Sequence, residues 1–193
     1  MLIAIDASRA VNTKKTGVEW YSYNLIKTLT QIDQENEYLL YLQPSVKKEK
    51  NFGFDFNLPK NFKIKILNWP FNFFWTLGRL SLEMFKNPPE ILFVPSHVLP
   101  LILPKKSLIT IHDIGFNRFP QAYSFFEKIY HRFSIFFAKK YASKIITISQ
   151  FTKKELIEIS KINPDKIEVV YHGLDLEKFK KSNKLLDEKI LKN

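Results

Sequence analysis

The sequence predicts an α/β fold, specifically a Rossmann-like three-layer α/β/α domain built on a mostly parallel sheet. Strand-like and helix-like patterns alternate along the chain, which is typical of sheets whose strands are joined by helical crossovers. Several strand-like segments, among them residues 2–5 and 108–111, are short continuous apolar runs, as expected of strands buried on both faces. In such folds ligands bind beyond the carboxyl ends of the strands, so polar residues there are the first candidates for a site.

The individual elements follow from hydrophobic spacing. Strands are predicted where β-branched and aromatic residues cluster, and the alternation in FKIKIL predicts a half-buried strand. Helices are predicted where apolar residues recur at helical intervals, as they do in the third helix at Phe126, Ile129, Tyr130, Phe133 and Phe137, which form one stripe. The predicted strands lie at 2–5, 37–42, 62–67, 90–95, 107–113 and 143–149 and within 164–173, and the helices at 18–32, 73–86, 122–142 and 149–160.

Residues at the helix ends support these boundaries. Gly17 closes a polar loop before the first helix, and Asn87 with two following prolines ends the second. The hydroxyl of Ser149 can accept a hydrogen bond from a free backbone N–H in the first turn of the last helix, which makes Ser149 a candidate N-cap.

Composition narrows the class of protein. With 193 residues, 45% of them hydrophobic, the chain is long enough for one domain with a sizeable core, or for one domain and a tail. It contains no cysteine, which excludes a disulfide scaffold, thiolate metal sites and a cysteine nucleophile. The first ten residues read as a strand and not as a signal peptide. No uncharged apolar run approaches the roughly 20 residues that a membrane span needs.

The net charge of +11 is spread along the chain. Residues 1–112 hold 14 basic and 9 acidic groups and residues 113–193 hold 16 and 10, giving surpluses of +5 and +6. A dispersed excess gives only weak attraction to polyanions such as nucleic acid, anionic lipid or nucleotide phosphate. A general lysine bias of composition explains it equally well.

His112 and Asp113 follow a predicted buried strand directly and are the first candidates for chemistry. Histidine can donate, accept or carry charge near neutral pH, and a neighbouring carboxylate can orient the ring or bind sugar hydroxyls. The alternative is that both residues merely bond to nearby backbone. Asp6 follows the first strand in the same way and has the same two interpretations.

Gly17 precedes a helix, where free N–H groups and the helix dipole suit an anion such as phosphate, with Lys14 and Lys15 close by. Ordinary turn chemistry is the alternative. Neither the dinucleotide fingerprint G-x-G-x-x-G nor a P-loop occurs in the sequence. Three of the four histidines fall at or just beyond strand ends, and His131 is the exception, which we expect to be structural or exposed. No H-x-x-x-H spacing exists, so we expect no metal site.

The segment NWPFNFFWTLGRL (residues 68–80) is unusually aromatic and has two interpretations. Trp and Phe near cations are favoured at a membrane interface. Packing on the sheet is the favoured alternative, because the domain needs aromatic residues for its core.

Five segments, in order, resemble glycosyltransferase family 4 enzymes over nearly all of residues 1–180. They are IDASRAVNTKKTGVEWYSYNLIKTL, TLGRLSLEMFKNPPEILFVPSHVLP, TIHDIGFNRFPQAYS, IITISQFTKKEL and IEVVYHGLDLEKF. The chain departs from the family pattern at Leu77, where Gln is expected, and at Glu90, where Asp is common.

This resemblance implies a GT-B fold, in which two Rossmann-like domains face each other across a cleft. Only the first, acceptor-binding domain is matched, and the E-x₇-E element of the second is absent from the sequence. We therefore expect a Rossmann-like N-terminal domain at residues 1–175, followed by a charged linker at 176–193 toward a C-terminal donor-binding domain. The chain alone is expected to be inactive.

The resemblance also implies retaining transfer of a sugar from a nucleotide-sugar donor to an acceptor hydroxyl of a glycan or lipid-linked acceptor. Catalysis would be mostly positioning and electrostatics, with no metal or other cofactor. His112 and Asp113 are implied as the catalytic residues, and His112 as a positioning residue first. The implied donor- and acceptor-binding residues are Arg9, Thr16, Gly17, Val18, His97, Ser149, His172 and Gly173.

The implied location is cytoplasmic, with peripheral contact at the inner face of the membrane at most, and no nucleic-acid partner is expected. Two other functions remain open. A non-enzymatic Rossmann-like module that binds nucleic acid or an anionic surface would need a concentrated basic face, and the even charge distribution argues against it. A dehydrogenase or epimerase would need the missing dinucleotide glycines.

Overall fold

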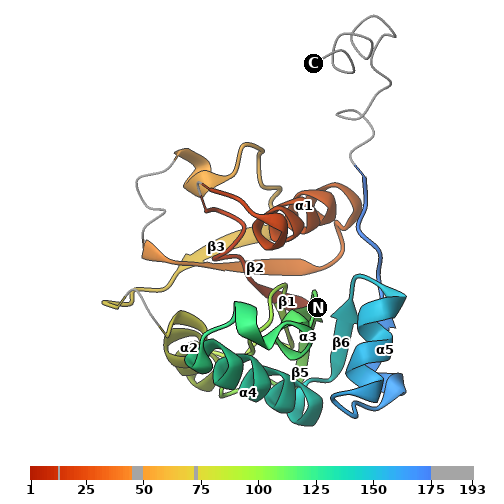
Figure 1. Cartoon of the computed structure of the whole chain (residues 1–193). Coiled ribbons are helices and arrows are strands. Elements are labelled where there is room, and N and C mark those ends of the chain that lie inside the picture. Colours follow the sequence, from red (N-terminus) through yellow and green to blue (C-terminus); the bar gives the residue numbers. More distant parts are fainter. Residues whose placement is uncertain (13, 45–49, 72–73, 175–193) are drawn as a thin grey trace, which may run out of the picture.

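The strands of this protein form a single parallel sheet. The computed structural model describes residues 1–12, 14–44, 50–71 and 74–174 (Figure 1). Within these ranges seven strands pair in the order β3-β2-β1-β4-β5-β6-β7, and every neighbouring pair is parallel. The strands are β1 Leu2–Asp6, β2 Glu37–Leu42, β3 Phe62–Ile66, β4 Ile91–Val94, β5 Lys106–Ile111, β6 Lys144–Thr147 and β7 Ile167–Val169.

Helices cover both faces of the sheet and complete three layers (Figure 1). On one face α1 buries Tyr23 and Ile26 against β1 and β2, and on the other α2, α4 and α5 pack on the core of β5 and β6. The longer helical elements are α1 Gly17–Ile32, the π-helix η3 Trp75–Leu80, α2 Ser81–Lys86, α4 Phe125–Tyr141 and α5 Gln150–Glu158, and the short α3 is Gly115–Arg118. The predicted three-layer α/β/α fold with a parallel sheet is confirmed.

The predicted boundaries differ from the observed ones by only a few residues. The short elements η2 Lys50–Gly53, α3, η4 Pro120–Ala122 and η5 Pro164–Lys166 were not predicted, because one-turn helices carry too little periodicity to show in a sequence. The charged linker predicted at 176–193 lies outside the described residues.

In the aromatic segment 68–80 some side chains are buried, as core packing predicts, and others are exposed. Trp75 and Leu80 are buried in the core and Trp69 packs against it, as core packing predicts. Phe71 and Phe74 are exposed, and residues 72–73 lie outside the described residues. Gly78 is needed here because a Cβ at this position would lie 2.8 Å from the ring carbon Cζ2 of Trp69.

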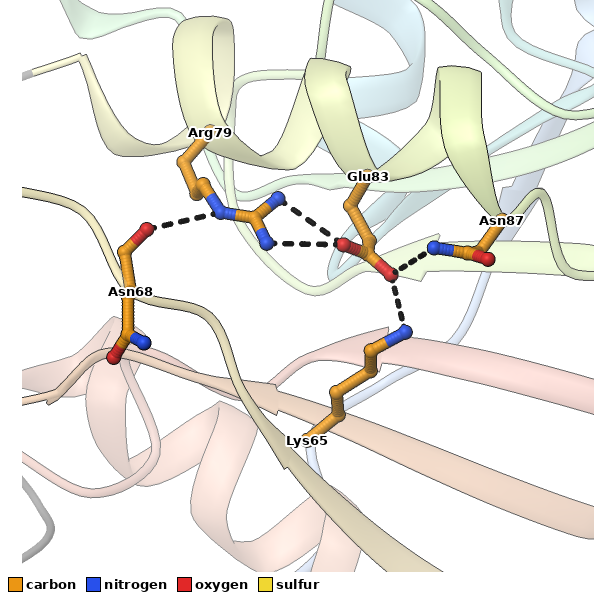
Figure 2. A network of polar contacts seen from close by, with 5 residues as sticks. All are labelled: Lys65, Asn68, Arg79, Glu83 and Asn87. Atoms are coloured by element: carbon orange, nitrogen blue, oxygen red, sulfur yellow. Dashed lines mark hydrogen bonds and ion pairs between the residues drawn. The ribbon is translucent and has the colours of Figure 1, made fainter.

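The helix that runs from η3 into α2 is fixed to β3 by a buried carboxylate, Glu83 (Figure 2). One Glu83 oxygen lies 2.5 Å from Lys65 Nζ on β3 and 3.0 Å from Asn87 Nδ2, and the other accepts two bonds of 3.1 Å from Arg79. Burial alone would raise the pKa of Glu83, but these hydrogen bonds outweigh it and hold the pKa below its ordinary value. The network fixes the position of η3, which carries one wall of the candidate site.

The apolar stripe predicted on the third helix does not face the sheet. Phe126, Ile129, Tyr130 and Phe133 are exposed, and only Phe137 packs against the core. The buried residues of α4 are instead Ser134, Ile135 and Ala138. Most of the larger apolar residues therefore point away from the core, and the small residues Ser134 and Ala138 allow the helix to lie close to the sheet.

Candidate functional site

The candidate site is a cleft of about 610 Å³ at the carboxyl edge of the sheet. Because all strands run in the same direction, the segments that leave them meet at this edge. The cleft is lined by the loop after β1, the first turn of α1, the π-helix η3, the loop after β4 and the N-terminal half of α4. Of the predicted site residues, Arg9, Thr16, Val18 and His97 line it.

Asp6 forms the floor of the cleft and has a structural role. Its carboxylate accepts hydrogen bonds from Ser8 N at 3.1 Å, Trp75 Nε1 at 3.3 Å and Thr76 Oγ1 at 3.5 Å. Burial raises the pKa of Asp6 despite these bonds. Asp6 thus bonds its own loop, as the local interpretation expects, and also ties β1 to the η3 wall of the cleft.

Arg9 and Thr16 both donate hydrogen bonds to the carboxylate of Glu19, which lies in the first turn of α1. Glu19 accepts from Arg9 Nη1 at 3.1 Å and from Thr16 N at 3.1 Å, and it also contacts the Thr16 hydroxyl. The Glu19 side chain is buried, whereas that of Arg9 remains half exposed. Sequence reasoning missed Glu19, although an acidic residue three positions after a Thr N-cap is the pattern of a capping box.

All four histidines of the chain lie in one row along this edge. The ring centroids are 6.3 Å apart for His131 and His97, 5.2 Å for His97 and His112, and 6.1 Å for His112 and His172. The four rings come from α4, the loop after β4, the end of β5 and the segment after β7. The row joins the cleft, which contains His97 and His131, to a second group around His112 and His172.

His131 was expected to be structural or exposed, and this expectation is only partly right. Its ring stacks on Phe116 with centroids 5.3 Å apart, but it also lines the cleft. Its sequence position inside a long helix gave no sign of this, because helical spacing does not tell which turn reaches the edge of the sheet.

His112 is buried, and its surroundings define its tautomer. Nε2 lies 3.3 Å from the carbonyl oxygen of Pro95, which can only accept, so Nε2 carries the proton and Nδ1 of the neutral ring is an acceptor. Burial lowers the pKa of His112, and that of His97 falls to about 4, mainly through burial and then through the neighbouring His112. Both rings are therefore uncharged near neutral pH.

Tyr21 of α1 is a member of the His112 group that sequence reasoning missed. Its ring meets those of His112 and His172 edge-on, with centroids 4.8 and 5.3 Å away. Its hydroxyl lies 3.1 Å from Thr110 Oγ1 on β5. Tyr21 appears in the sequence as one apolar position of an amphipathic helix, so only the packing of α1 over β5 shows its role.

Asp113, the other predicted catalytic residue, bonds to its own loop. Its Oδ1 accepts from Gly115 N at 2.8 Å and starts α3, and the side chain is exposed. Asp113 thus shows the local bonding that was the alternative to a catalytic role.

Ser149 caps α5 as predicted, because its hydroxyl accepts from Thr152 N at 3.1 Å. Thr152 in turn donates to the His112 carbonyl oxygen at 3.1 Å, which couples this helix start to the His112 backbone. Gly17 and Gly173 are exposed, and a Cβ at either would meet nothing within 4 Å, so neither is required there for steric reasons.

Within the described ranges no group of three or more His, Asp or Glu side chains is arranged to hold a metal ion. No helix in that part of the chain is long and apolar enough to cross a membrane. The cleft thus presents imidazole, hydroxyl and indole groups together with the Asp6 and Glu19 carboxylates and the partly exposed guanidinium of Arg9.

A sequence model of Glycosyltransferase Family 4 matches residues 15–178. The chain belongs to glycosyltransferase family 4. The resemblance seen in the sequence motifs is thereby confirmed at the level of the family. The match includes the starts of α1 and α5 and the whole row of histidines.

This family 4 chain is also similar to the O-antigen chain mannosyltransferase RfbU of Salmonella typhimurium strain LT2. The two are 26% identical over 123 residues, which is 64% of this chain and 33% of the relative. The matched region therefore spans about a third of the length of that curated relative.

Proposed function

We propose that this chain is the acceptor-binding half of a retaining GT-B glycosyltransferase that acts in glycan biosynthesis. The enzyme would transfer a sugar from a nucleotide-sugar donor to an acceptor hydroxyl. The observation that carries the proposal is the cleft at the carboxyl edge of a family 4 domain, lined by His97 and His131, from which the row of histidines continues to His112 and His172. The similarity to a mannosyltransferase supports the same reaction class.

The two parts of the edge suit two substrates. In our proposal the cleft between η3, the β1 loop and α4 holds the acceptor, with Arg9, Thr16, Val18 and His97 on its walls. The group around His112, His172 and Gly173, with Ser149 beside it, faces the donor sugar, and Gly17 lies beside the donor diphosphate. A C-terminal domain would complete the donor site.

The reaction needs positioned neutral groups more than a strong base. When the nucleoside diphosphate leaves, the bond between the sugar carbon and the phosphate oxygen breaks, and the acceptor oxygen bonds to that carbon. The acceptor proton passes to the leaving phosphate. His112 Nδ1, uncharged and free to accept, would hold a donor-sugar hydroxyl while this happens. No metal or other cofactor is part of the proposal.

The same proposal places the enzyme in the cytoplasm and makes the 193-residue chain inactive by itself. The test measures release of nucleoside diphosphate from a panel of UDP- and GDP-sugars, with oligosaccharides or lipid-linked sugars as acceptors. It compares the chain alone with the chain extended by the coding sequence downstream of Asn193. We expect activity only for the extended protein. Robust transfer by the chain alone, or none by either protein, would contradict the proposal.

A further inference from the structure

Tyr21 has a fixed place between the first helix and the fifth strand. It lies near the start of α1, and its side chain is partly buried. Its hydroxyl lies 3.1 Å from Oγ1 of Thr110, a fully buried residue of β5. Packing of α1 on the sheet needs only an apolar side chain at this position. A buried pair of hydroxyls also selects one arrangement of the two side chains, which indicates a role beyond packing.

Strand geometry explains why Tyr21 reaches His112. Alternate residues of a strand point to the same face, so Thr110 and His112 lie on one side of the sheet. Ile109 and Ile111 point the other way, into the core beneath α4 and α5. A tyrosine whose hydroxyl meets Thr110 therefore has its ring beside His112. The centroids of the two rings are 4.8 Å apart, and the rings are nearly perpendicular, at 88°.

The imidazole of His112 needs such a neighbour to keep its orientation. In the part of the chain that the structure describes, its hydrogen-bond partner is the carbonyl oxygen of Pro95 alone. That distance of 3.3 Å is longer than the usual N–H···O distance of about 2.9–3.0 Å. One long bond allows the ring to rock about its Cβ–Cγ bond. The ring of Tyr21 restricts this motion, so Nδ1 keeps its direction.

His172 depends on Tyr21 even more. β7 ends at Val169, and among the described residues no hydrogen bond holds the segment 171–174 that follows. His172 is exposed, and its ring meets Tyr21 with centroids 5.3 Å apart and His112 with centroids 6.1 Å apart. Loss of the Tyr21 ring would therefore release both imidazoles.

We propose that Tyr21 is a positioning residue for the sugar transfer: anchored by Thr110, its ring holds the imidazoles of His112 and His172 toward the donor sugar. This role rests on the proposed function, but the arrangement of the rings can be measured without any transfer. Tyr21 is not among the residues that line the cleft assigned to the acceptor. Its effect should therefore fall on the reacting centre and not on acceptor binding.

The first test is NMR of the imidazole groups in the 193-residue chain, with the His112 signals assigned through His112→Gln. In the wild type the Nε2–H tautomer of His112 should dominate, and the pKa of His112 should lie below 6.5 because of burial. Tyr21→Leu should produce a mixture of tautomers, raise this pKa toward 6.5 and shift the ring protons of His172. The charges of Asp113 and His172 also act on His112, and both residues are present in all Tyr21 variants.

Tyr21→Phe is the more conservative variant. It keeps the aromatic ring but removes the bond to Thr110, so it should change the His112 and His172 signals in the same direction as Tyr21→Leu and to a smaller extent. Because it preserves the packing of α1, it decides the question by itself if Tyr21→Leu does not fold.

Tyr23 supplies the matched control on the same helix. It is more deeply buried than Tyr21, and its hydroxyl contacts Asp55. Tyr23→Phe should lower the free energy of unfolding at least as much as Tyr21→Phe does, but leave the His112 and His172 signals unchanged. Unchanged histidine signals in Tyr21→Phe, or changes of equal size in Tyr23→Phe, would overturn the proposal.

The second test is steady-state kinetics of the extended protein. Tyr21→Leu should lower kcat about 10- to 100-fold, because the donor sugar is held less well, and leave the acceptor KM within about 2-fold. An unchanged kcat, with or without a higher acceptor KM, would contradict the proposal. If the wild-type extended protein transfers no sugar, the proposed function fails, whereas the NMR spectra still decide whether Tyr21 places the two imidazoles.

Discussion

The rings of His97 and His112 lie with their centroids 5.2 Å apart, although one follows β4 and the other ends β5. The two strands are parallel neighbours, so their carboxyl ends bring the two residues together. Burial disfavours a positive charge on both rings, and the neighbouring His112 disfavours it further on His97, as His172 does on His112. The pair is therefore a set of neutral hydrogen-bonding groups that acid would disturb.

The first prediction concerns the pH dependence of stability. The pKa of His97 is about 4 in the folded protein and about 6.5 in the unfolded chain, so between these values the unfolded chain binds more protons. The free energy of unfolding should therefore fall as the pH drops from about 6.5 to 4. His97→Gln removes this proton uptake, and its free energy of unfolding should fall less over the same range. Urea denaturation followed by circular dichroism at several pH values measures both slopes.

His131→Gln is the control for this comparison, because His131 is only half-buried and lies at the end of the row. Its slope should stay close to that of the wild type. A His97→Gln slope equal to the wild-type slope would show that His97 is not held neutral by the fold.

The second prediction concerns His112 in the extended protein that we propose to be the active form. His112→Ala should lower kcat at least about 10²-fold, because the hydrogen bond that Nδ1 would accept from a donor-sugar hydroxyl is lost where charge develops. His112→Phe should lower kcat similarly while keeping an aromatic ring against Tyr21. Steady-state kinetics with saturating acceptor measures the effect.

Lys60→Ala, an exposed change before β3, is the activity control for His112. Thermal unfolding of all three variants separates loss of function from loss of fold. Turnover near the wild-type level in His112→Ala would mean that His112 only closes the end of β5 through its bond to Pro95.

The sequence alone was sufficient to predict the sheet and part of the candidate site. Continuous apolar runs predicted the parallel strands, and the strand-end rule then pointed to His97, His112 and His172, which do lie in one row. Each of these residues immediately follows or closely follows a strand. Their sequence position therefore determines their place in space.

Residues on helices were harder to place. Tyr21 and His131 reach the site from α1 and α4, and which helical turn arrives there depends on how each helix packs on the sheet. The stripe on α4 had the spacing of a core-facing helix, but spacing does not say which side faces the sheet. Small residues at Ser134 and Ala138 decide it, because they allow closer approach to β5 and β6.

The third prediction concerns the close contact of Gly78 with Trp69. A Cβ at position 78 would lie 2.8 Å from Cζ2 of the indole, so Gly78→Ala must displace the ring. We expect the free energy of unfolding to fall by about 1–3 kcal/mol, although alanine favours helices more than glycine does. Gly17→Ala is the control, since its Cβ would meet nothing within 4 Å and should cost little. Denaturant unfolding measures both, and equal stabilities would show that η3 adjusts without strain.

The last prediction concerns the buried carboxylate of Glu83, which holds η3 and α2 against β3. Glu83→Gln keeps the shape of the side chain but leaves Lys65 and Arg79 without their counter-charge (Figure 2). The Glu83 side chain is only 3% exposed, so we expect the free energy of unfolding to fall by about 2–4 kcal/mol at neutral pH. Glu37→Gln removes a similar pair with Lys63 that is exposed on both sides, and should cost at most about 1 kcal/mol.

The pH dependence of this effect has a definite sign. The pKa of Glu83 is lowered by folding, so its contribution is fully present above the ordinary carboxyl pKa of 4.5 and is lost as the pH falls through the folded value. The difference in free energy of unfolding between wild type and Glu83→Gln should therefore be largest near neutral pH and shrink below about pH 4.5. Denaturant titrations of both proteins across this range measure it. A difference that stays constant down to acidic pH would mean that shape and packing at position 83, and not its charge, hold the helix on the sheet.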